Sequence, residues 1–294
     1  MEQLESQDSP AEVIQRERQL VRQLTGLTDD AGLAFVDSGW TSRVYVCNGG
    51  EWVLKFPRSE RVKREYGRER RVLELLERVD TSVQVPRLRW TDADNAYLGY
   101  AGIVGVELAS HQAELALTGK QAVGESLGGF LRALHDLTLP DLRTISVRDE
   151  ITELQEKYEL VRPVIERAFT AREQQQLDRL VARRLPEELA SLGEDLALCH
   201  GDLGYWNVIR KPDGGIGIID WGDAGYYDRS KDFMAIEDPQ LLGAALHAYG
   251  DSDNLRAKIA TRQTVLYLLD LPFFVGKRDE AGIAKTVAKI RSAL

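Results

Sequence analysis

A short polar stretch, enclosed by apolar segments of strand-like length, constrains this chain more than any other feature. It reads His-Gly-Asp-Leu-Gly-Tyr-Trp-Asn over residues 200–207, among segments whose apolar spacing is otherwise helical. A second polar group begins at Asp220, directly after the apolar run Ile216–Ile219. We predict short strands at residues 196–200, 208–210 and 216–220, which puts two carboxylates and an amide at strand ends.

Three of these polar residues have the order and spacing of a phosphoryl-transfer site. In kinases an Asp accepts the hydroxyl proton, an Asn a few positions later holds metal, and a second Asp after a strand holds metal between the phosphates. Asp202, Asn207 and Asp220 follow that order, and Mg²⁺ prefers such hard oxygen ligands. Each residue alone could instead cap a turn or end a strand. The three together favour phosphoryl transfer.

The N-terminal half offers the other parts of a nucleotide kinase site in the expected order. Residues 38–45 predict a turn in which Ser42 and nearby backbone amides could face phosphates, although the three-glycine pattern is missing. Lys55 lies within an apolar strand, where its charge requires a partner. Glu65 and Glu69 lie four positions apart on the next helix, and either could reach Lys55. The alternative is an edge-strand lysine that faces solvent.

Length and composition are compatible with two lobes. The chain has 294 residues, of which 43% are hydrophobic and 29% charged, enough to bury a sizeable core. Its richest apolar run, Thr264–Gly276, is interrupted by Asp270 and Pro272, so it predicts a buried helix and no membrane span. The net charge of −9 disfavours nonspecific binding to nucleic acid and makes a cationic partner more plausible.

The cysteines and the N-terminal residues indicate where the protein works. Cys47 and Cys199 are too few for a disulfide framework, which fits a reducing compartment. Residues 1–10 lack the basic and apolar regions of a signal peptide, so we expect a cytoplasmic protein. The four histidines are too dispersed for a zinc site; we expect His135 to satisfy local hydrogen bonds and His200 to support the catalytic loop.

Apolar periodicity predicts an α+β chain with a β-rich N-terminal lobe and a mostly helical C-terminal lobe. In residues 1–104 we expect a helix at 11–24, an antiparallel meander at 33–36, 43–47 and 52–56, a helix from Ser59 that ends before Asp80, and strands at 83–90 and 97–104. In residues 105–294 we expect helices at 121–137, 149–169, 171–184, 239–249, 257–271 and 280–294.

The polar strings resemble the aminoglycoside phosphotransferase family of kinase-like enzymes. The resemblance is carried by residues 200–209 and by Gly-Ile-Ile-Asp-Trp-Gly-Asp-Ala at 217–224. Residues 54–58, 98–108, 130–135 and 228–238 look like the aminoglycoside 2''-phosphotransferase branch, so the resemblance covers residues 39–238. It implies a two-lobed protein-kinase-like fold. Macrolide phosphotransferases, a sister group, usually lack Asn at the position of Asn207.

The resemblance also implies roles for single residues. Asp202 would be the catalytic base, Asn207 and Asp220 would hold Mg²⁺, and Lys55 would bind the phosphates. The helix glutamate falls on Glu69 in preference to Glu65. Residues 100–105 would form the hinge that binds the purine of ATP or GTP, through Tyr100 and Ile103. Gly201 replaces the arginine that protein kinases usually have there, which points to a small-molecule acceptor.

The resemblance implies transfer of the γ-phosphoryl group of ATP or GTP to a hydroxyl of an aminoglycoside, which would confer antibiotic resistance. A polycationic acceptor needs several carboxylates around it, and Asp223, Glu237 and Asp238 are the candidates. Glu237 and Asp238 could equally be acids favoured at a helix N-terminus. Kinases of another small alcohol (a macrolide, an amino alcohol or a sugar derivative) and a non-catalytic kinase-like binding protein are the alternatives. We expect a monomer without a membrane or nucleic-acid partner.

Overall fold

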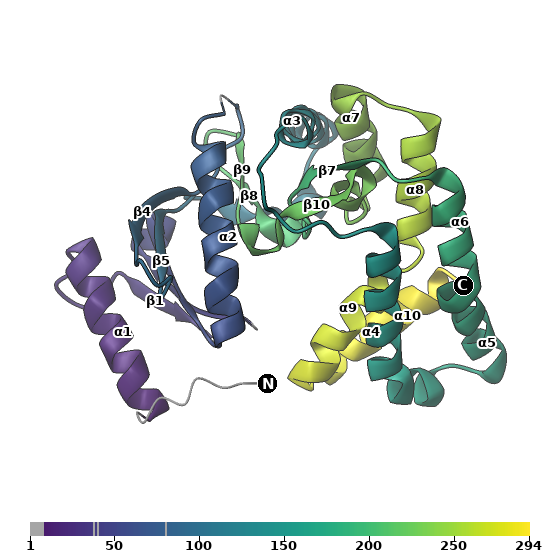
Figure 1. The fold of residues 1–294 in the computed structure, drawn as a ribbon, viewed down its shortest axis with the longest axis horizontal. Helices are drawn as coiled ribbons and strands as arrows, with labels where there is room; N and C mark the ends of the chain where they lie inside the picture. Colours follow the sequence, from purple (N-terminus) through teal and green to yellow (C-terminus); the bar gives the residue numbers. More distant parts are fainter. Residues whose placement is uncertain (1–8, 38, 40, 80) are drawn as a thin grey trace. The chain divides into compact units, whose positions relative to one another are not determined.

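The computed structural model describes residues 9–37, 39, 41–79 and 81–294 (Figure 1). The chain divides into two compact units. The first unit comprises Met1–Phe130 and Tyr205–Ala224, and the second comprises Leu131–Gly204 and Gly225–Leu294. The lobes predicted from the sequence, residues 1–104 and 105–294, are a different division from these two units, and that division stays a prediction.

The first unit contains a five-stranded antiparallel sheet in the order β1-β2-β3-β5-β4. Its strands are β1 (Leu33–Val36), β2 (Ser42–Cys47), β3 (Trp52–Pro57), β4 (Arg87–Thr91) and β5 (Leu98–Ala101). The first three strands confirm the predicted meander. The fourth begins several residues later than predicted, at the end of the segment 83–90.

Two helices accompany this sheet: α1 (Pro10–Thr25) precedes β1, and α2 (Glu60–Leu76) lies between β3 and β4 in sequence. Ser59 caps α2 as predicted, because its hydroxyl accepts a hydrogen bond from the Val62 amide and so satisfies a free helix-end donor. One hydrophobic cluster joins α1 to the sheet, with Val21, Tyr45, Cys47, Leu54 and Phe56 buried. Helix α2 buries one side, with Val62, Tyr66, Val72 and Leu73 among its buried residues, and its other side carries the charged residues that the sequence indicates.

The first unit also contains a smaller antiparallel sheet in the order β6-β8-β9. Its strands are β6 (Val106–Glu107), β8 (Val208–Arg210) and β9 (Ile216–Ile218). Short helical turns cover 48–50, 108–110, 112–114, 205–207 and 221–223. Helix α3 (Leu117–His135) belongs to the first unit up to Phe130 and to the second thereafter.

The second unit is mostly helical, with a two-stranded sheet of β7 and β10. Its elements are α4 (Val147–Ala168), α5 (Ala171–Arg179), a π-turn (Leu180–Arg184), α6 (Leu185–Leu192), β7 (Leu196–Cys199), β10 (Gly225–Asp228), a 3₁₀ turn (Arg229–Phe233), α7 (Pro239–Tyr249), α8 (Asp253–Gln263), α9 (Leu266–Lys277) and α10 (Glu280–Ser292).

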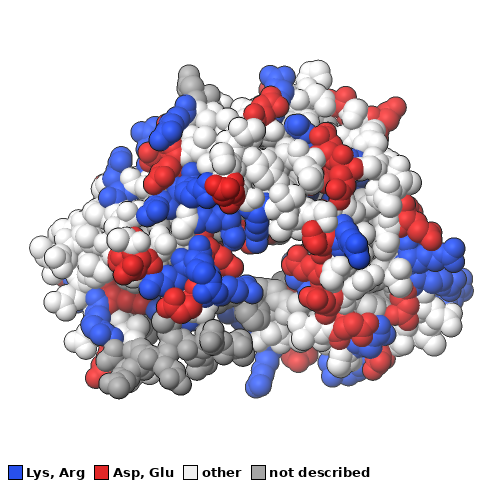
Figure 2. Space-filling view, viewed as in Figure 1, with Lys and Arg blue, Asp and Glu red and all other residues white. Residues whose placement is uncertain are grey.

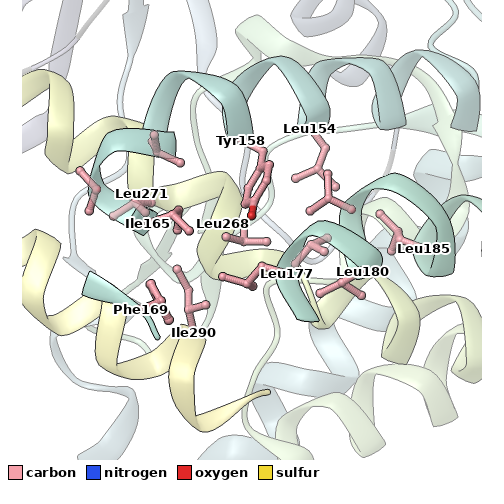
Figure 3. Close-up of a cluster of buried hydrophobic side chains, with 14 of the residues drawn as sticks. Leu154, Tyr158, Ile165, Phe169, Leu177, Leu180, Leu185, Leu268, Leu271 and Ile290 are labelled. Atoms are coloured by element: carbon pink, nitrogen blue, oxygen red, sulfur yellow. The ribbon is translucent and has the colours of Figure 1, made fainter. Parts of the chain in front are cut away.

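One hydrophobic cluster holds α4, α5, α6, α9 and α10 together (Figure 3). In the close-up, the ring of Tyr158 points from α4 toward Leu268 on α9. The Tyr158 hydroxyl donates to Asp178 over 3.0 Å, so this buried polar tip has a partner. The cluster lies wholly within the second unit and gives it a core of its own.

Two helix predictions in this unit are wrong. The predicted single helix at 257–271 is two helices, because the backbone leaves helical geometry at Val265. The Thr264 hydroxyl donates to the Thr261 carbonyl next to this break. The helix predicted at 171–184 continues through the π-turn into α6, which the sequence reasoning did not assign. Pro186 lies in the first turn of α6, where proline is tolerated.

A closed ion cluster lies in the second unit around Asp228. The Lys258 ammonium donates to the Asp228 carboxylate over 2.7 Å, and both side chains are at least 95% buried. Ser230 also donates to Asp228, and the Arg262 guanidinium lies 3.8 Å away. Burial alone would raise the pKa of Asp228, but hydrogen bonds from Lys258 and Ser230 bring it below its ordinary value.

The surface is charged with both signs. Figure 2 shows Lys and Arg interspersed with Asp and Glu on the visible face. Among the residues that the structure describes, no helix combines the length and the apolar character needed to cross a bilayer.

Candidate active site

Lys55 is the centre of a charged cluster in the first unit. It lies on β3 and is only 7% exposed, and its Nζ is 3.1 Å from both carboxylate oxygens of Glu69 and 2.8 Å from Oδ1 of Asp220. Burial alone would lower the pKa of Lys55, but the carboxylates of Asp220 and Glu69 raise it well above its usual value. The ammonium group is therefore a fixed positive charge between two acids.

The two glutamates that could have reached Lys55 lie in different surroundings. Glu69 on α2 is 2% exposed and pairs with Lys55. Glu65 pairs with Arg61 one turn away on the surface of the same helix, at 3.3 Å. The structure thus pairs the preferred candidate with the lysine, and the alternative of a solvent-facing lysine is wrong.

Ser42 occupies the buried start of β2. The Tyr66 hydroxyl on α2 donates to the Ser42 hydroxyl over 2.7 Å, and Ser42 is 3% exposed. This bond ties the turn before β2 to the helix that carries Glu69. Its proposed contact with phosphate stays a prediction, and Ser38 and Trp40 of the same turn lie outside the described residues.

Asn207 and Asp220 lie at the same end of the β8-β9 ribbon. Val208 pairs with Ile218, and the Ile219 amide donates to the Asn207 carbonyl over 3.0 Å, so the residues that flank the ribbon are neighbours. Asp220 adopts a left-handed backbone (φ 63°), unusual for a residue with a side chain, and its carboxylate is 56% exposed. One amide oxygen and one accessible carboxylate form a donor set that fits Mg²⁺, which takes further oxygens from phosphates and water.

Arg68 is a residue of this site that the sequence reasoning missed. Its guanidinium on α2 donates to the Gly222 carbonyl over 2.9 Å, two residues after Asp220. Trp221 between them is fully buried, and its indole N–H donates to the Ile218 carbonyl. Helix α2 is therefore attached on both sides of Trp221, through Lys55 and through Arg68. An arginine among the many charges of α2 gave no sequence signal.

The predicted hinge residues lie at the end of β5 and just after it. Tyr100 pairs with Val53 on one side and Leu88 on the other, within the sheet. Ile103 packs closely on β9, since a Cβ on Gly217 would come within 2.5 Å of the Ile103 side chain. Only glycine fits at position 217. The purine-binding role of Tyr100 and Ile103 stays a prediction.

Asp202 lies in the second unit, on an exposed loop that follows β7. Asp232 holds this loop, because its carboxylate accepts hydrogen bonds from the His200 amide (2.8 Å) and the Gly201 amide (2.9 Å). The Asp202 amide donates to Nδ1 of His200 over 3.3 Å, in agreement with the supporting role expected for His200. Gly201 has φ 86°, a conformation that favours glycine.

Asp232 is also a member of a buried Cys-His-Asp group. His135 Nε2 lies 3.3 Å from the Asp232 carboxylate and 3.6 Å from the Cys199 sulfur. These are ligand types for a transition metal, and the sequence prediction about dispersed histidines overlooked them because the fold collects them from distant positions. Burial raises the pKa of the Cys199 thiol well above its usual value. Burial would also raise the pKa of Asp232, but the hydrogen bond from His135 and the loop amides lower it.

The three acids predicted to bind the acceptor belong to different units. Asp223 is exposed in the first unit, whereas Glu237 and Asp238 belong to the second. Asp238 caps α7, since its carboxylate accepts from the Gln240 and Leu241 amides, which is the helix-end role that the sequence left open. Glu237 faces the Lys289 ammonium at 3.6 Å.

Asp270 on α9 is an acid of the second unit that the sequence reasoning did not assign to the site. Burial, together with the charges of Asp202 and Glu237, raises its pKa to about 6, and Lys289 and Lys157 partly offset this. Asp202 and Glu237 thus lie close enough to Asp270 for their charges to act on it. The sequence feature that could have pointed to Asp270 is its position as a single charge within the apolar run Thr264–Gly276.

Residues 32–260 match the family described as the phosphotransferase enzyme family, which is most of the chain. The chain belongs to the phosphotransferase enzyme family. No match was found among curated protein sequences.

Solved structures with this fold include three phosphotransferases. The GDP and kanamycin complex of APH(2'')-IIIa matches at a TM-score of 0.78 and 18% identity, over 95% of this chain and 98% of that one. The streptomycin-ATP-APH(2'')-IIa ternary complex matches at 0.68 and 18%, over 97% of each chain. Macrolide 2'-phosphotransferase type I matches at 0.67 and 20%, over 99% of each. These likenesses establish the kinase-like α+β fold predicted for this family member.

Within this phosphotransferase, the predicted site residues are shared between the two units. The first unit holds the residues predicted to bind nucleotide and metal, namely Ser42, Lys55, Glu69, Tyr100, Ile103, Asn207 and Asp220, and also Asp223. The second unit holds Asp202, Glu237 and Asp238. Each unit therefore carries part of the predicted site.

Proposed function

We propose that this family member transfers the γ-phosphoryl group of ATP or GTP to a hydroxyl of an aminoglycoside, and so confers resistance to that antibiotic. The cluster of Lys55, Glu69 and Asp220 is the observation that carries the proposal. It presents a buried cation next to an accessible carboxylate, as nucleotide phosphates with Mg²⁺ require. Structural relatives crystallised with GDP and kanamycin or with ATP and streptomycin support the choice of donor and acceptor.

The roles of the residues follow from their charge and placement. Lys55 neutralises phosphate oxygens and Glu69 keeps its ammonium group in place. Asn207 and Asp220 would hold Mg²⁺, which supplies positive charge to the phosphates. Asp202, exposed at the loop that Asp232 secures, orients the acceptor hydroxyl and takes its proton. Most of the catalysis is positioning and electrostatic stabilisation.

The charges in the second unit support a cationic acceptor. The carboxylates of Asp202 and Glu237 act on Asp270, and the ammonium groups of Lys289 and Lys157 only partly offset them. An ammonium group of the acceptor would relieve the repulsion at Asp270. Charge-assisted hydrogen bonds of this kind give an aminoglycoside both affinity and orientation.

A macrolide is the second candidate, because a macrolide 2'-phosphotransferase matches over almost the whole chain. Screening the purified protein with ATP and with GTP against aminoglycosides, macrolides and metabolite alcohols decides between them. We expect phosphorylation of an aminoglycoside. Phosphorylation of macrolides alone would show that the acceptor is a macrolide and not an aminoglycoside. Binding of nucleotide without phosphorylation of any acceptor would indicate a non-catalytic binding protein.

The Asp202→Asn variant tests the mechanism in the same assay. We expect turnover to fall by about three orders of magnitude with nucleotide affinity nearly unchanged, because the carboxylate acts on the acceptor alone. Activity close to that of the unmodified protein would refute Asp202 as the base. We further propose that the enzyme is a monomer and works in the cytoplasm, where its nucleotide donor is abundant. The boundary between its two lobes would follow residue 104.

A further inference from the structure

A continuous chain of hydrogen bonds runs through the second unit to the loop of Asp202. The Arg229 guanidinium donates to the Tyr249 hydroxyl over 3.1 Å, and this hydroxyl lies 2.9 Å from Nδ1 of His135. The other ring nitrogen of His135, Nε2, lies 3.3 Å from the Asp232 carboxylate. Asp232 in turn accepts from the backbone amides of His200 and Gly201.

The chemistry of the donors fixes the direction of this chain. Arginine can only donate, so the Tyr249 oxygen accepts from Arg229 and its single proton must find another acceptor. Among the described residues its other hydrogen-bond partner is Nδ1 of His135. Burial raises the pKa of the Tyr249 hydroxyl, so it keeps that proton. A ring that accepts this proton at Nδ1 and carries a single proton of its own has that proton on Nε2.

We propose that Tyr249 is a positioning residue for phosphoryl transfer, which fixes His135 as the Nε2–H tautomer so that the ring donates to Asp232. The carboxylate then receives three donors, from the His135 ring and from the His200 and Gly201 amides. Asp232 stays ionised and oriented, and it holds the two residues that precede Asp202.

The opposite tautomer would weaken the same loop. With its proton on Nδ1, His135 would turn a lone pair from Nε2 toward the negative Asp232, and the Tyr249 proton would lose its acceptor. Buried polar groups left without partners are costly, so the loop would shift or loosen. The consequence for catalysis rests on the proposed function, because it assumes that Asp202 acts on the acceptor. The tautomer of His135 does not depend on that assumption.

Nitrogen-15 NMR of the histidine rings tests the tautomer without any activity. The chain has four histidines, and His111→Gln and His247→Gln variants identify two of the rings. We expect the His135 ring to show the Nε2–H pattern in the unmodified protein and to change in Tyr249→Phe. An Nδ1–H ring or an imidazolium in the unmodified protein would overturn the proposal.

Kinetics of the same variant test the positioning role. Tyr249→Phe keeps the ring packed against His135 and Phe233 but removes the hydroxyl. We expect kcat to fall about tenfold or more, with KM for nucleotide and acceptor within about twofold, because the loop of Asp202 is misplaced while binding groups remain.

Tyr158→Phe is the matched control, since it removes another buried tyrosine hydroxyl of the second unit, bonded to Asp178 and with no link to Asp232. We expect its kcat within about twofold of the unmodified protein. Equal losses of kcat in both variants, or no loss in Tyr249→Phe, would refute the positioning role. If the unmodified protein phosphorylates no acceptor, the proposed function fails, and the NMR result still decides the tautomer.

Discussion

Each unit of this phosphotransferase buries a lysine against a carboxylate, yet the two clusters differ in the exposure of the acid. Lys258 meets Asp228, whose side chain is 1% exposed and bonded on all sides to Ser230, the Asp195 amide and Lys258 itself. Lys55 meets Asp220, whose side chain is 56% exposed. The lysines themselves are equally buried, at 4% and 7%.

The difference separates an ion pair that holds the fold from one that can exchange partners. A carboxylate enclosed by donors has no free oxygen for a ligand, so the Asp228 cluster can only be structural. The exposed part of Asp220 leaves room for the proposed metal, while Glu69 is a second acid paired with Lys55. The exposure of the acid, more than the burial of the lysine, distinguishes the functional cluster.

Removing the enclosed acid should have the largest effect. Asp228→Asn leaves Lys258 buried without its counter-charge, so we expect the free energy of unfolding to fall by about 3–5 kcal/mol in denaturant titrations. Asp213→Asn, which removes the charge of an exposed pair with Lys211, should leave the free energy of unfolding nearly unchanged. Equal small losses would mean that the enclosed cluster is not needed for stability.

Removing the accessible acid should affect turnover instead. In Asp220→Asn, Lys55 keeps Glu69, so we expect the unfolding free energy to change by less than about 1 kcal/mol. Turnover should fall by about 10²–10³-fold, and Mg²⁺ should no longer strengthen nucleotide binding in calorimetry. A Mg²⁺ dependence equal to that of the unmodified protein would show that Asp220 is not a ligand, and the contrast with Asp228 would collapse.

Asp270 is an intermediate case, because it is partly buried and its pKa is about 6. At pH 5.5 roughly a quarter of the carboxyl is ionised, so we expect KM for a cationic acceptor to rise about fourfold between pH 7.5 and 5.5. Asp270→Asn should show a high KM without this step.

Ionisation of Asp270 should favour binding of a cationic acceptor, but it lowers the stability of the folded protein. A carboxyl whose pKa is raised on folding stabilises the protein below its ordinary pKa of 3.8, and that contribution is lost as the pH rises through about 6. A pH-independent acceptor KM in the unmodified protein would remove Asp270 from the acceptor site.

The smallest effect is expected at the glutamate that does not reach Lys55. Glu65→Gln disturbs only a surface pair with Arg61, so kcat and KM should stay within about twofold. Glu69→Gln, one turn further along the same helix, should lower turnover by more than tenfold, since Lys55 loses its buried counter-charge. Similar kcat and KM values for both variants would show that the burial of Glu69 beside Lys55 does not matter for turnover.

Local chemistry made much of the site predictable from the sequence. Lys55 is a charge in an apolar strand, so the cost of burying an unpaired charge already predicts a partner for it. The cap at Ser59 and the meander of β1, β2 and β3 depend on neighbouring residues alone, and both were confirmed. The choice of Glu69 over Glu65 needed the resemblance to a family, since spacing allowed both.

Contacts between distant residues were not predictable in the same way. Asp232 reaches the loop of Asp202 from thirty positions away, and Arg68 reaches Gly222 across most of the first unit's sequence. Helix α9, which begins after the break at Val265, packs against α4 and α10, and no local pattern encodes these neighbours. Asp270 looked like a flaw in an apolar helix, although its raised pKa marks it as part of an acidic group.

Both cysteines are buried, and burial raises the pKa of each thiol. Thiols that stay protonated and enclosed react slowly with maleimides and nitroxide reagents. The native chain therefore provides a nearly silent background for labelling, without the usual removal of its own cysteines. A cysteine introduced at an exposed position in each unit would carry a pair of spin labels, and their separation with and without nucleotide would report how the two halves of the enzyme move.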